Sequence, residues 1–190
     1  MRYQKGHGAA VRQRIIEIAS SKFREEGIEA TGIASVMSDA GLTHGGFYSH
    51  FASRDELVKS ALQHGLRARS DHYAELLANG SDLAEVIRRY VSARHRDNPG
   101  NGCTVATLAP EVARQSGETR AVFTRGLEVF LGMVGRQWST GTAKARRDKA
   151  IVLYAMMVGT VQMARSTNDE ILSDQILASG LAAALDFAKS

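Results

Sequence analysis

The residues best suited to chemistry in this sequence lie close together between Thr43 and His50. They carry hydroxyl, imidazole and phenol groups, which form hydrogen bonds with phosphate oxygens and base edges of nucleic acids. Two adjacent glycines in the same segment would cost a helix about 1 kcal/mol each relative to alanine, but they let the backbone approach a partner closely. The candidate contact residues are Thr43, His44, Gly45, Gly46, Tyr48 and His50.

Two short helical segments joined by a tight turn are expected to position these groups. Residues 33–40 form the first segment and residues 43–51 the second. Gly41 lies between them, where a tight turn needs a positive φ, and Thr43 is suited to cap the second helix through its hydroxyl. The two phenylalanines of the second segment are expected to face inward. This pattern predicts a helix-turn-helix, whose second helix enters the major groove of DNA by its N-terminal end.

A basic arm precedes this unit. Arg2, Lys5, Arg12 and Arg14 all come before the first acidic residue, and such side chains neutralise phosphates and release counterions. The formal charge of the chain, +4, agrees with a polyanionic partner. A glycine pair before aromatic residues also fits a flexible turn with ordinary surface histidines. The position of the unit behind a basic arm is what favours DNA binding.

The rest of the sequence indicates an all-α protein. The chain has 190 residues, of which 44% are hydrophobic and 23% charged, enough for one large domain or two small ones. Apolar residues recur at spacings of three and four without strand alternation, and a single cysteine excludes an intramolecular disulfide framework. No apolar segment follows the basic N-terminus and no run approaches about 18 apolar residues. We therefore expect a cytoplasmic protein without a membrane partner.

Two domains are expected from the order of the helices. Residues 1–52 form the helix-turn-helix domain, and residues 53–190 form a larger helical domain. A helix over residues 53–78 links the two, since Ser53 and Glu56 fit a capping box at its start. Further helices are expected at about 82–97, 104–115, 123–138, 144–165 and 170–188.

The motifs of the first third of the chain resemble those of the TetR-type (TetR/AcrR-like) transcriptional regulators. They keep the family's order and spacing as Phe23-Arg-Glu-Glu-Gly27, Ala40-Gly-Leu-Thr43, Phe47-Tyr-Ser-His-Phe51 and Ser53-Arg-Asp-Glu-Leu57. The resemblance implies an effector-responsive repressor that binds a palindromic operator as a dimer and is released by a small, largely apolar ligand. It also makes residues 53–190 the effector-binding and dimerisation domain.

The resemblance implies roles for single residues as well. Tyr48 matches a tyrosine that contacts phosphate, and Arg54 replaces the more usual lysine after the Ser53 cap. Thr31 matches a threonine that opens the second helix near a phosphate. Gly32 departs from the family pattern, because a second Ser or Thr is frequent there, which puts that phosphate contact in doubt. The expected DNA-binding set comprises Arg2, Lys5, Thr31, Thr43, His44, Gly45, Gly46, Tyr48, His50 and Arg54.

The last two helices are the expected homodimer interface. Residues 150–164 are apolar on nearly all sides, which indicates burial on more than one face. Small residues recur in both helices and allow an antiparallel pair to approach its two-fold mate. Tight packing inside one subunit would use the same residues. A palindrome needs two recognition helices about 34 Å apart, and this need favours the dimer.

Aromatic, thioether and aliphatic residues in the second half are candidates for an apolar effector pocket, because they adapt to irregular apolar guests. Plain core packing accounts for the same stripes. Gln162 is a polar group in an apolar helix, suited to orient a ligand or to bond a neighbouring carbonyl. The candidate ligand-binding residues are Cys103, Phe123, Leu127, Phe130, Trp138, Tyr154, Met157 and Gln162.

Other functions stay open from the sequence. Cys103 lies near an expected helix N-terminus, where a thiolate is stabilised, so a thiol- or electrophile-sensing regulator is one alternative and a small buried residue is the competing role. His64 and His72 share a helix face and are expected to be solvated. No zinc-protease helix, nucleophile elbow or phosphate loop occurs, so we expect no enzyme, cofactor or metal site. A helical protein-interaction adaptor or a small-molecule enzyme without DNA binding are the alternatives of another class.

Overall fold

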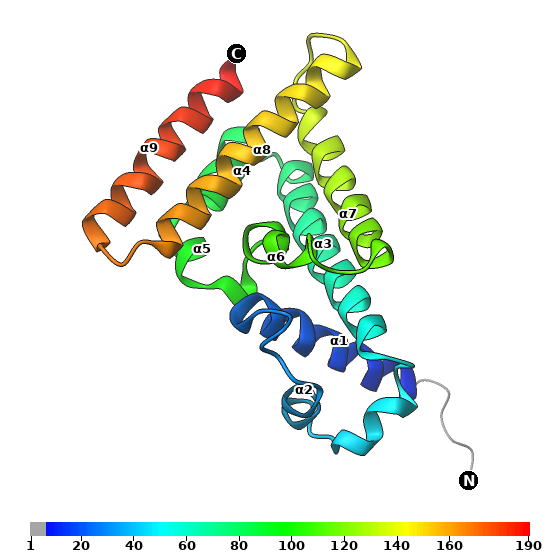
Figure 1. The fold of residues 1–190 in the computed structure, drawn as a ribbon. Helices are drawn as coiled ribbons and strands as arrows, with labels where there is room; N and C mark the ends of the chain where they lie inside the picture. The colour runs from blue at the N-terminus through cyan, green and yellow to red at the C-terminus, as the bar shows by residue number, and fades with distance from the viewer. Residues whose placement is uncertain (1–6) are drawn as a thin grey trace.

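The computed structural model describes residues 7–190, and every regular element in that range is a helix (Figure 1). This confirms the all-α fold. In chain order the elements are α1 (His7–Glu26), α2 (Ile33–Asp39), the 3-10 helix η1 (His44–Ser49), α3 (Arg54–Ala78), α4 (Leu83–Tyr90), α5 (Ala93–Asp97), the 3-10 helix η2 (Pro99–Asn101), α6 (Thr104–Val112), α7 (Gly117–Gly135), α8 (Ala143–Ser166) and α9 (Glu170–Lys189).

Side-chain caps and glycine turns set several helix ends. The Ser53 hydroxyl accepts the Glu56 N–H at 3.1 Å, and the Glu56 carboxylate accepts the Ala52 N–H at 2.7 Å. The cap that starts α3 is therefore confirmed. Gly27 and Gly41 follow α1 and α2 with φ values of 96° and 73°, which glycine adopts without strain.

Two elements differ from the expectation for local reasons. The second helix of the helix-turn-helix is a 3-10 helix, η1, because Gly45 and Gly46 give its first turn poor α-helix propensity. The helix expected over residues 82–97 breaks after Tyr90 into α4 and α5. The break follows from Ser92, whose hydroxyl accepts the His95 N–H at 3.2 Å and so starts a new helix.

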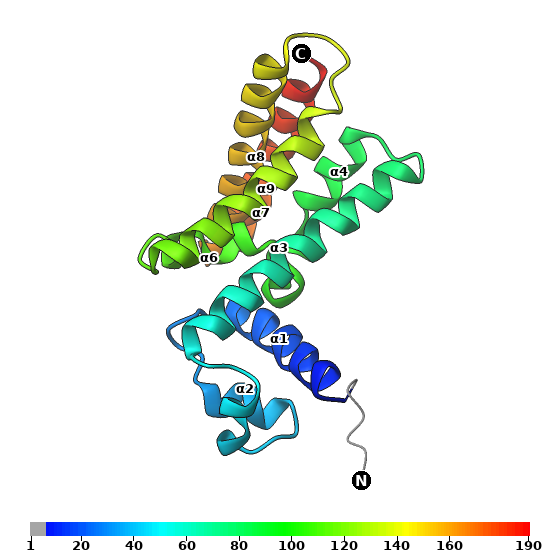
Figure 2. The ribbon, with the colours of Figure 1, turned by 90° about the vertical axis from the view of Figure 1, so that its right-hand side faces the viewer.

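The helices form a lower and an upper part. α1, α2 and η1 make the lower part, and α3 rises from them into the upper part (Figure 1). α8 and α9 pack side by side along one edge, and α7 packs against both α8 and α3. After a quarter turn, α4 lies to the right of α7 and α8 (Figure 2), and it packs against α3 and α9.

α3 belongs to two hydrophobic cores. Leu57 and Leu62 pack in the lower core, whereas Leu66 and Tyr73 pack in the upper core. Leu108 of α6 also enters the lower core. The lower part thus shares its core with residues beyond 52, so its orientation is tied to the upper part through α3 and α6. The domain boundary between residues 52 and 53 stays a prediction.

α9 is apolar but little of it is buried. Of the described helices, it has the length and composition to cross a membrane, with a mean hydropathy of 1.3 over its best 18 residues, of which 17% are buried. Its inner side packs closely on α8, because Gly180 leaves room for Thr160 where a Cβ would clash. On its outer side Ile171 is 73% exposed. The single chain therefore leaves an apolar face of α9 uncovered.

Candidate DNA-binding surface

Backbone hydrogen bonds around Gly41 close the turn between α2 and η1. The Gly41 N–H donates to the Ser38 carbonyl and the Leu42 N–H donates to the Met37 carbonyl, both at 2.9 Å. A Cβ added at Gly41 would meet no atom within 4 Å, so glycine is required there by its positive φ and not by space. The turn of the expected helix-turn-helix is present with its glycine in the predicted conformation.

Two phenylalanines hold η1 on the lower core, as expected. Phe47 is fully buried and Phe51 nearly so, and their stacked rings have centroids 5.4 Å apart. Tyr48, the residue after Phe47, is 69% exposed. The expected side-chain cap at Thr43 is wrong: its hydroxyl makes no capping hydrogen bond, and its carbonyl accepts the Gly46 N–H at 3.0 Å instead. The backbone closes this 3-10 turn, which leaves the hydroxyl free.

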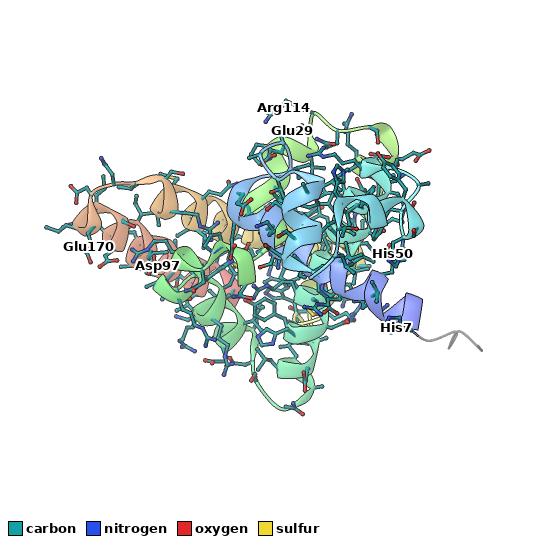
Figure 3. The ribbon with its side chains drawn as sticks, turned by 90° about the horizontal axis from the view of Figure 1, so that it is seen from below. His7, Glu29, His50, Asp97, Arg114 and Glu170 are labelled. Atoms are coloured by element: carbon teal, nitrogen blue, oxygen red, sulfur yellow. The ribbon has the colours of Figure 1, made fainter. Side chains whose placement is uncertain are left out.

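The outer side of η1 combines polar side chains with open backbone. A Cβ added at Gly45 would meet no atom within 4 Å, so a partner has direct access to the main chain there. Seen from below, His50 at the end of η1 lies on the same side as His7 at the start of α1 (Figure 3). The structure exposes Thr43, His44, Gly45 and Tyr48, and half-buries Gly46 and His50.

Arg12 braces η1 from α1. Its Nε donates to the His50 carbonyl at 3.2 Å, and its Nη2 donates to the Glu56 carboxylate at 2.8 Å. The guanidinium also lies 4.6 Å from the centre of the Phe51 ring. The sequence predicts Arg12 in a phosphate-binding arm. In the structure its side chain instead holds the end of η1 against α1 and α3. No local pattern indicates this role, because the partners lie about 40 residues away.

Two residues expected at phosphates have internal partners instead. Thr31 is 2% exposed, and its hydroxyl donates to the Gly27 carbonyl at 2.7 Å. Arg54 is half-buried and donates to the carbonyls of Ile28 and Thr31. These contacts close the turn after α1, where helix carbonyls lack partners. In this structure, Thr31 and Arg54 therefore stabilise that turn, and the phosphate contacts expected of them stay predictions.

The described residues of the lower part and the start of α3 carry no excess of basic side chains. Residues 7–61 contain six Lys or Arg and seven Asp or Glu. Lys22 pairs with Asp39 at 2.8 Å and Lys59 pairs with Glu118 at 2.6 Å, whereas Arg14 is exposed and makes no ion pair within residues 7–190. Arg2 and Lys5, expected to bind phosphate, lie outside the described residues. Neutral donors on η1 therefore dominate the described candidate surface.

Apart from Gln162, the residues expected to line an apolar effector pocket belong to the upper core or pack against it. Trp138 is 8% exposed and its indole N–H donates to the Ala188 carbonyl at 3.1 Å. A void that some of these residues share measures about 10 Å³, room for about one water molecule. Cys103, Phe130, Trp138, Tyr154 and Met157 are buried, Phe123, Leu127 and Gln162 are half-buried, and the void touches Cys103, Leu127, Phe130 and Tyr154.

Cys103 lies at the N-terminal end of α6 as expected, but it is 1% exposed. Its sulfur is 3.1 Å from the Tyr154 hydroxyl oxygen, and its N–H donates to His95 Nε2 at 2.9 Å. Since Nε2 accepts, Nδ1 carries the proton and donates to the Tyr90 carbonyl at 2.7 Å. Burial lowers the pKa of His95 to about 4, although the Tyr90 contact favours the charged form. His95 is thus a neutral, buried imidazole that holds the N–H of the buried Cys103.

Comparisons with known proteins agree with this geometry. Residues 15–61, from α1 into α3, match the family described as bacterial regulatory proteins, tetR family. The chain is 25% identical over 142 residues to the HTH-type transcriptional repressor KstR2 of Rhodococcus jostii, which covers 72% of this chain and 70% of that protein. It is 36% identical over 109 residues to KstR2 of Mycobacterium tuberculosis, across 57% of this chain and 54% of that protein. The fold is similar to a crystal structure of a TetR family transcriptional regulator from Agrobacterium tumefaciens, with a TM-score of 0.74, 20% identity and coverage of 93% and 98%.

Proposed function

The chain is a TetR-type DNA-binding transcriptional regulator and not an enzyme, and on that premise we propose that it represses transcription as a dimer on operator DNA. The outer face of η1 carries the proposal. Its polar groups are exposed while Phe47 and Phe51 fix the helix on the core, so the donors keep one arrangement relative to the fold. A fixed set of donors on a short helix is what groove recognition requires.

The groups on this face divide by role in the proposal. The hydroxyls of Thr43 and Tyr48 donate to phosphates and position the unit without reading sequence. His44, at the N-terminal end of η1, reads base edges, and the open backbone at Gly45 allows the close approach this needs. Arg14, together with Arg2 and Lys5, adds phosphate contacts whose strength falls with salt.

A second copy of the chain is the proposed cover for α8 and α9. On α8, Ile151 is 43% exposed and Met163 is 61% exposed, and on α9 Ile171 is 73% exposed. Contiguous apolar faces on two packed helices mark an interaction surface. Pairing two copies about a two-fold axis turns the helix pair into a four-helix bundle and supplies two recognition helices. The small residues Ala155 and Ala178 are exposed on the same helices and allow close approach.

Release from DNA by a small-molecule effector completes the proposal. The lower part is joined to the upper part through α3, which serves both cores, and through α6. A ligand that binds better to a conformation with α3 and α6 displaced would shift the population away from the operator spacing. The coupling therefore needs no contact between the ligand and η1.

Selection of bound DNA from a random pool, followed by fluorescence anisotropy with the selected duplex, tests this function. Tyr48→Phe removes one hydroxyl and should weaken binding to all sequences alike, whereas His44→Ala should relax sequence preference, each by about 1–3 kcal/mol. Ser139→Ala, an exposed change between α7 and α8, is the matched control. Unchanged DNA affinity in a folded, dimeric His44→Ala/Tyr48→Ala variant would overturn the assignment of η1 and favour an adaptor.

A further inference from the structure

An open groove of about 860 Å³ lies along α3, bordered by α4, α5 and η2. Among the described residues, none from η1, α8 or α9 lines it, so it is separate from the surfaces proposed for DNA and for the second copy. No Asp or Glu of residues 7–190 lines it either. Histidines, including His64 and His72, share the lining with five arginines, namely Arg24, Arg69, Arg88, Arg89 and Arg94.

Most of this positive charge lacks an ionic partner. Arg89 pairs with Glu85 at 2.6 Å, and it is the one lining arginine with an ion pair within the described residues. Arg88 and Arg94 are exposed and make no side-chain hydrogen bond there. Arg69 contacts the Tyr73 ring at 5.5 Å and donates to a backbone carbonyl. Guanidinium groups without carboxylates leave their donors available to a bound anion.

The cations also act on one another. Burial, and next the charge of Arg69, lowers the pKa of Arg24 to about 10. Burial, then Arg69 and Arg89, lowers the pKa of His72, against the opposing influence of Glu75. The arginines and His72 of the groove therefore lie close enough for their like charges to repel. A multiply charged anion between them would relieve that repulsion.

We propose that this groove binds a phosphorylated small molecule with at least two negative charges. The planar guanidinium fork matches phosphate oxygens, and several forks around one concave site suit a ligand with more than one anionic group. The groove has the volume of a small-molecule site. The claim that this ligand is the effector of the repressor rests on the function proposed above. The claim that it binds in the groove does not.

Two of the arginines connect the groove to the DNA-binding part. Arg24 of α1 donates from Nε to the Gly100 carbonyl at 2.8 Å, and Arg69 of α3 donates to the Asn101 carbonyl. Both carbonyls belong to η2. A phosphate accepts from guanidinium more strongly than a neutral carbonyl does, so the ligand competes for both arginines. α1 contributes residues to the lower core, on which η1 packs. Loosening the contact between α1 and η2 therefore changes the orientation of η1 relative to DNA.

Isothermal titration calorimetry of the full chain with inorganic pyrophosphate, at constant ionic strength, tests the groove. We expect a Kd on the order of 0.1 mM for the wild type. Arg88→Gln/Arg94→Gln should weaken binding about tenfold or more, because both side chains are exposed and hold no internal contact. The matched control is Arg67→Gln/Arg125→Gln, which removes two exposed charges on α3 and α7 outside the groove and should leave the Kd unchanged.

Anisotropy with the selected operator supplies the second readout. Saturating pyrophosphate should lower operator affinity of the wild type and of Arg67→Gln/Arg125→Gln, but not that of Arg88→Gln/Arg94→Gln. No binding of pyrophosphate up to about 5 mM, or equal loss in both double variants, would overturn the groove while leaving operator binding intact. Weaker operator binding by Arg88→Gln/Arg94→Gln without pyrophosphate would also overturn it, since the groove would then be a DNA contact. Pyrophosphate binding without any operator binding would instead contradict the proposed function alone.

Discussion

The carboxylate of Glu111 accepts the backbone N–H of Ile28 at 2.7 Å, so the end of α6 holds the turn between α1 and α2. The neighbouring Glu29 N–H reaches the same oxygen at 3.2 Å. Seen from below, Glu29 and Arg114 mark the edge where this turn meets the segment after α6 (Figure 3). A side chain of the upper part thus satisfies main-chain donors of the DNA-binding part.

Replacing Glu111 should uncouple the two parts. Glu111→Ala leaves the Ile28 N–H, which lies on a fully buried residue, without its acceptor, and should lower the free energy of unfolding by about 1–3 kcal/mol in urea denaturation. Glu118→Ala removes an exposed ion pair with Lys59 and should lower the free energy of unfolding by less than Glu111→Ala does. Equal losses in both variants would contradict the role given to Glu111.

Arg12 and Arg14 are two residues apart, but substituting them should have different effects on stability and on DNA binding. Arg12→Gln breaks the brace on His50, Glu56 and Phe51, so we expect a loss of about 1 kcal/mol in stability and weaker DNA binding with an unchanged salt slope. Arg14→Gln should leave stability unchanged and reduce the slope of log K against log salt by about 1. Unfolding curves and anisotropy over a salt series measure both, and a reduced slope in Arg12→Gln would contradict the brace.

His95 should make folding stability depend on pH. Its pKa is about 4 in the folded chain and 6.5 as the ordinary value, so the unfolded chain binds more protons between these limits. Stability is therefore full above pH 6.5 and falls as the pH drops towards 4, by about 3 kcal/mol in total. Urea unfolding at pH 7 and pH 4.5 should show a smaller drop for His95→Gln than for the wild type. An identical drop in both would contradict the buried neutral state.

The exposed apolar faces of α8 and α9 should control oligomeric state. Ile151→Glu/Ile171→Glu places a charge on each face and should convert a dimer into a monomer that binds the operator more weakly. Ala74→Glu/Ala78→Glu adds the same charges at exposed positions of α3 and should stay dimeric. Sedimentation velocity distinguishes the two states, and a dimeric Ile151→Glu/Ile171→Glu variant would exclude this interface.

Cys103 should be protected from thiol reagents while the chain is folded. Its side chain is buried beside Tyr154, so labelling should require local opening and proceed about 100-fold slower than in urea. Reaction of the folded protein at the unfolded rate would restore the electrophile-sensing alternative.

Interactions between neighbours in the chain made much of this protein predictable. The turn at Gly41, the cap at Ser53, the inward Phe47 and the outward Tyr48 depend on residues within a few positions. Apolar spacing of three and four sufficed for the all-α fold. The side-chain cap at Thr43 failed because the glycines after it favour a 3-10 turn that the backbone closes.

The partners of several charged side chains lie far from them in the sequence. Arg12 and Arg54 were expected to bind phosphate, and only the tertiary structure supplies their internal partners. His64 and His72 are partly or fully exposed, as expected, but only the packing of α4 and η2 beside α3 brings them together with arginines from four segments. Local periodicity specifies helices because their hydrogen bonds are short-range. The packing of helices that are distant in the sequence decides which charged side chains pair and which stay unpaired. A single sequence does not reveal that packing.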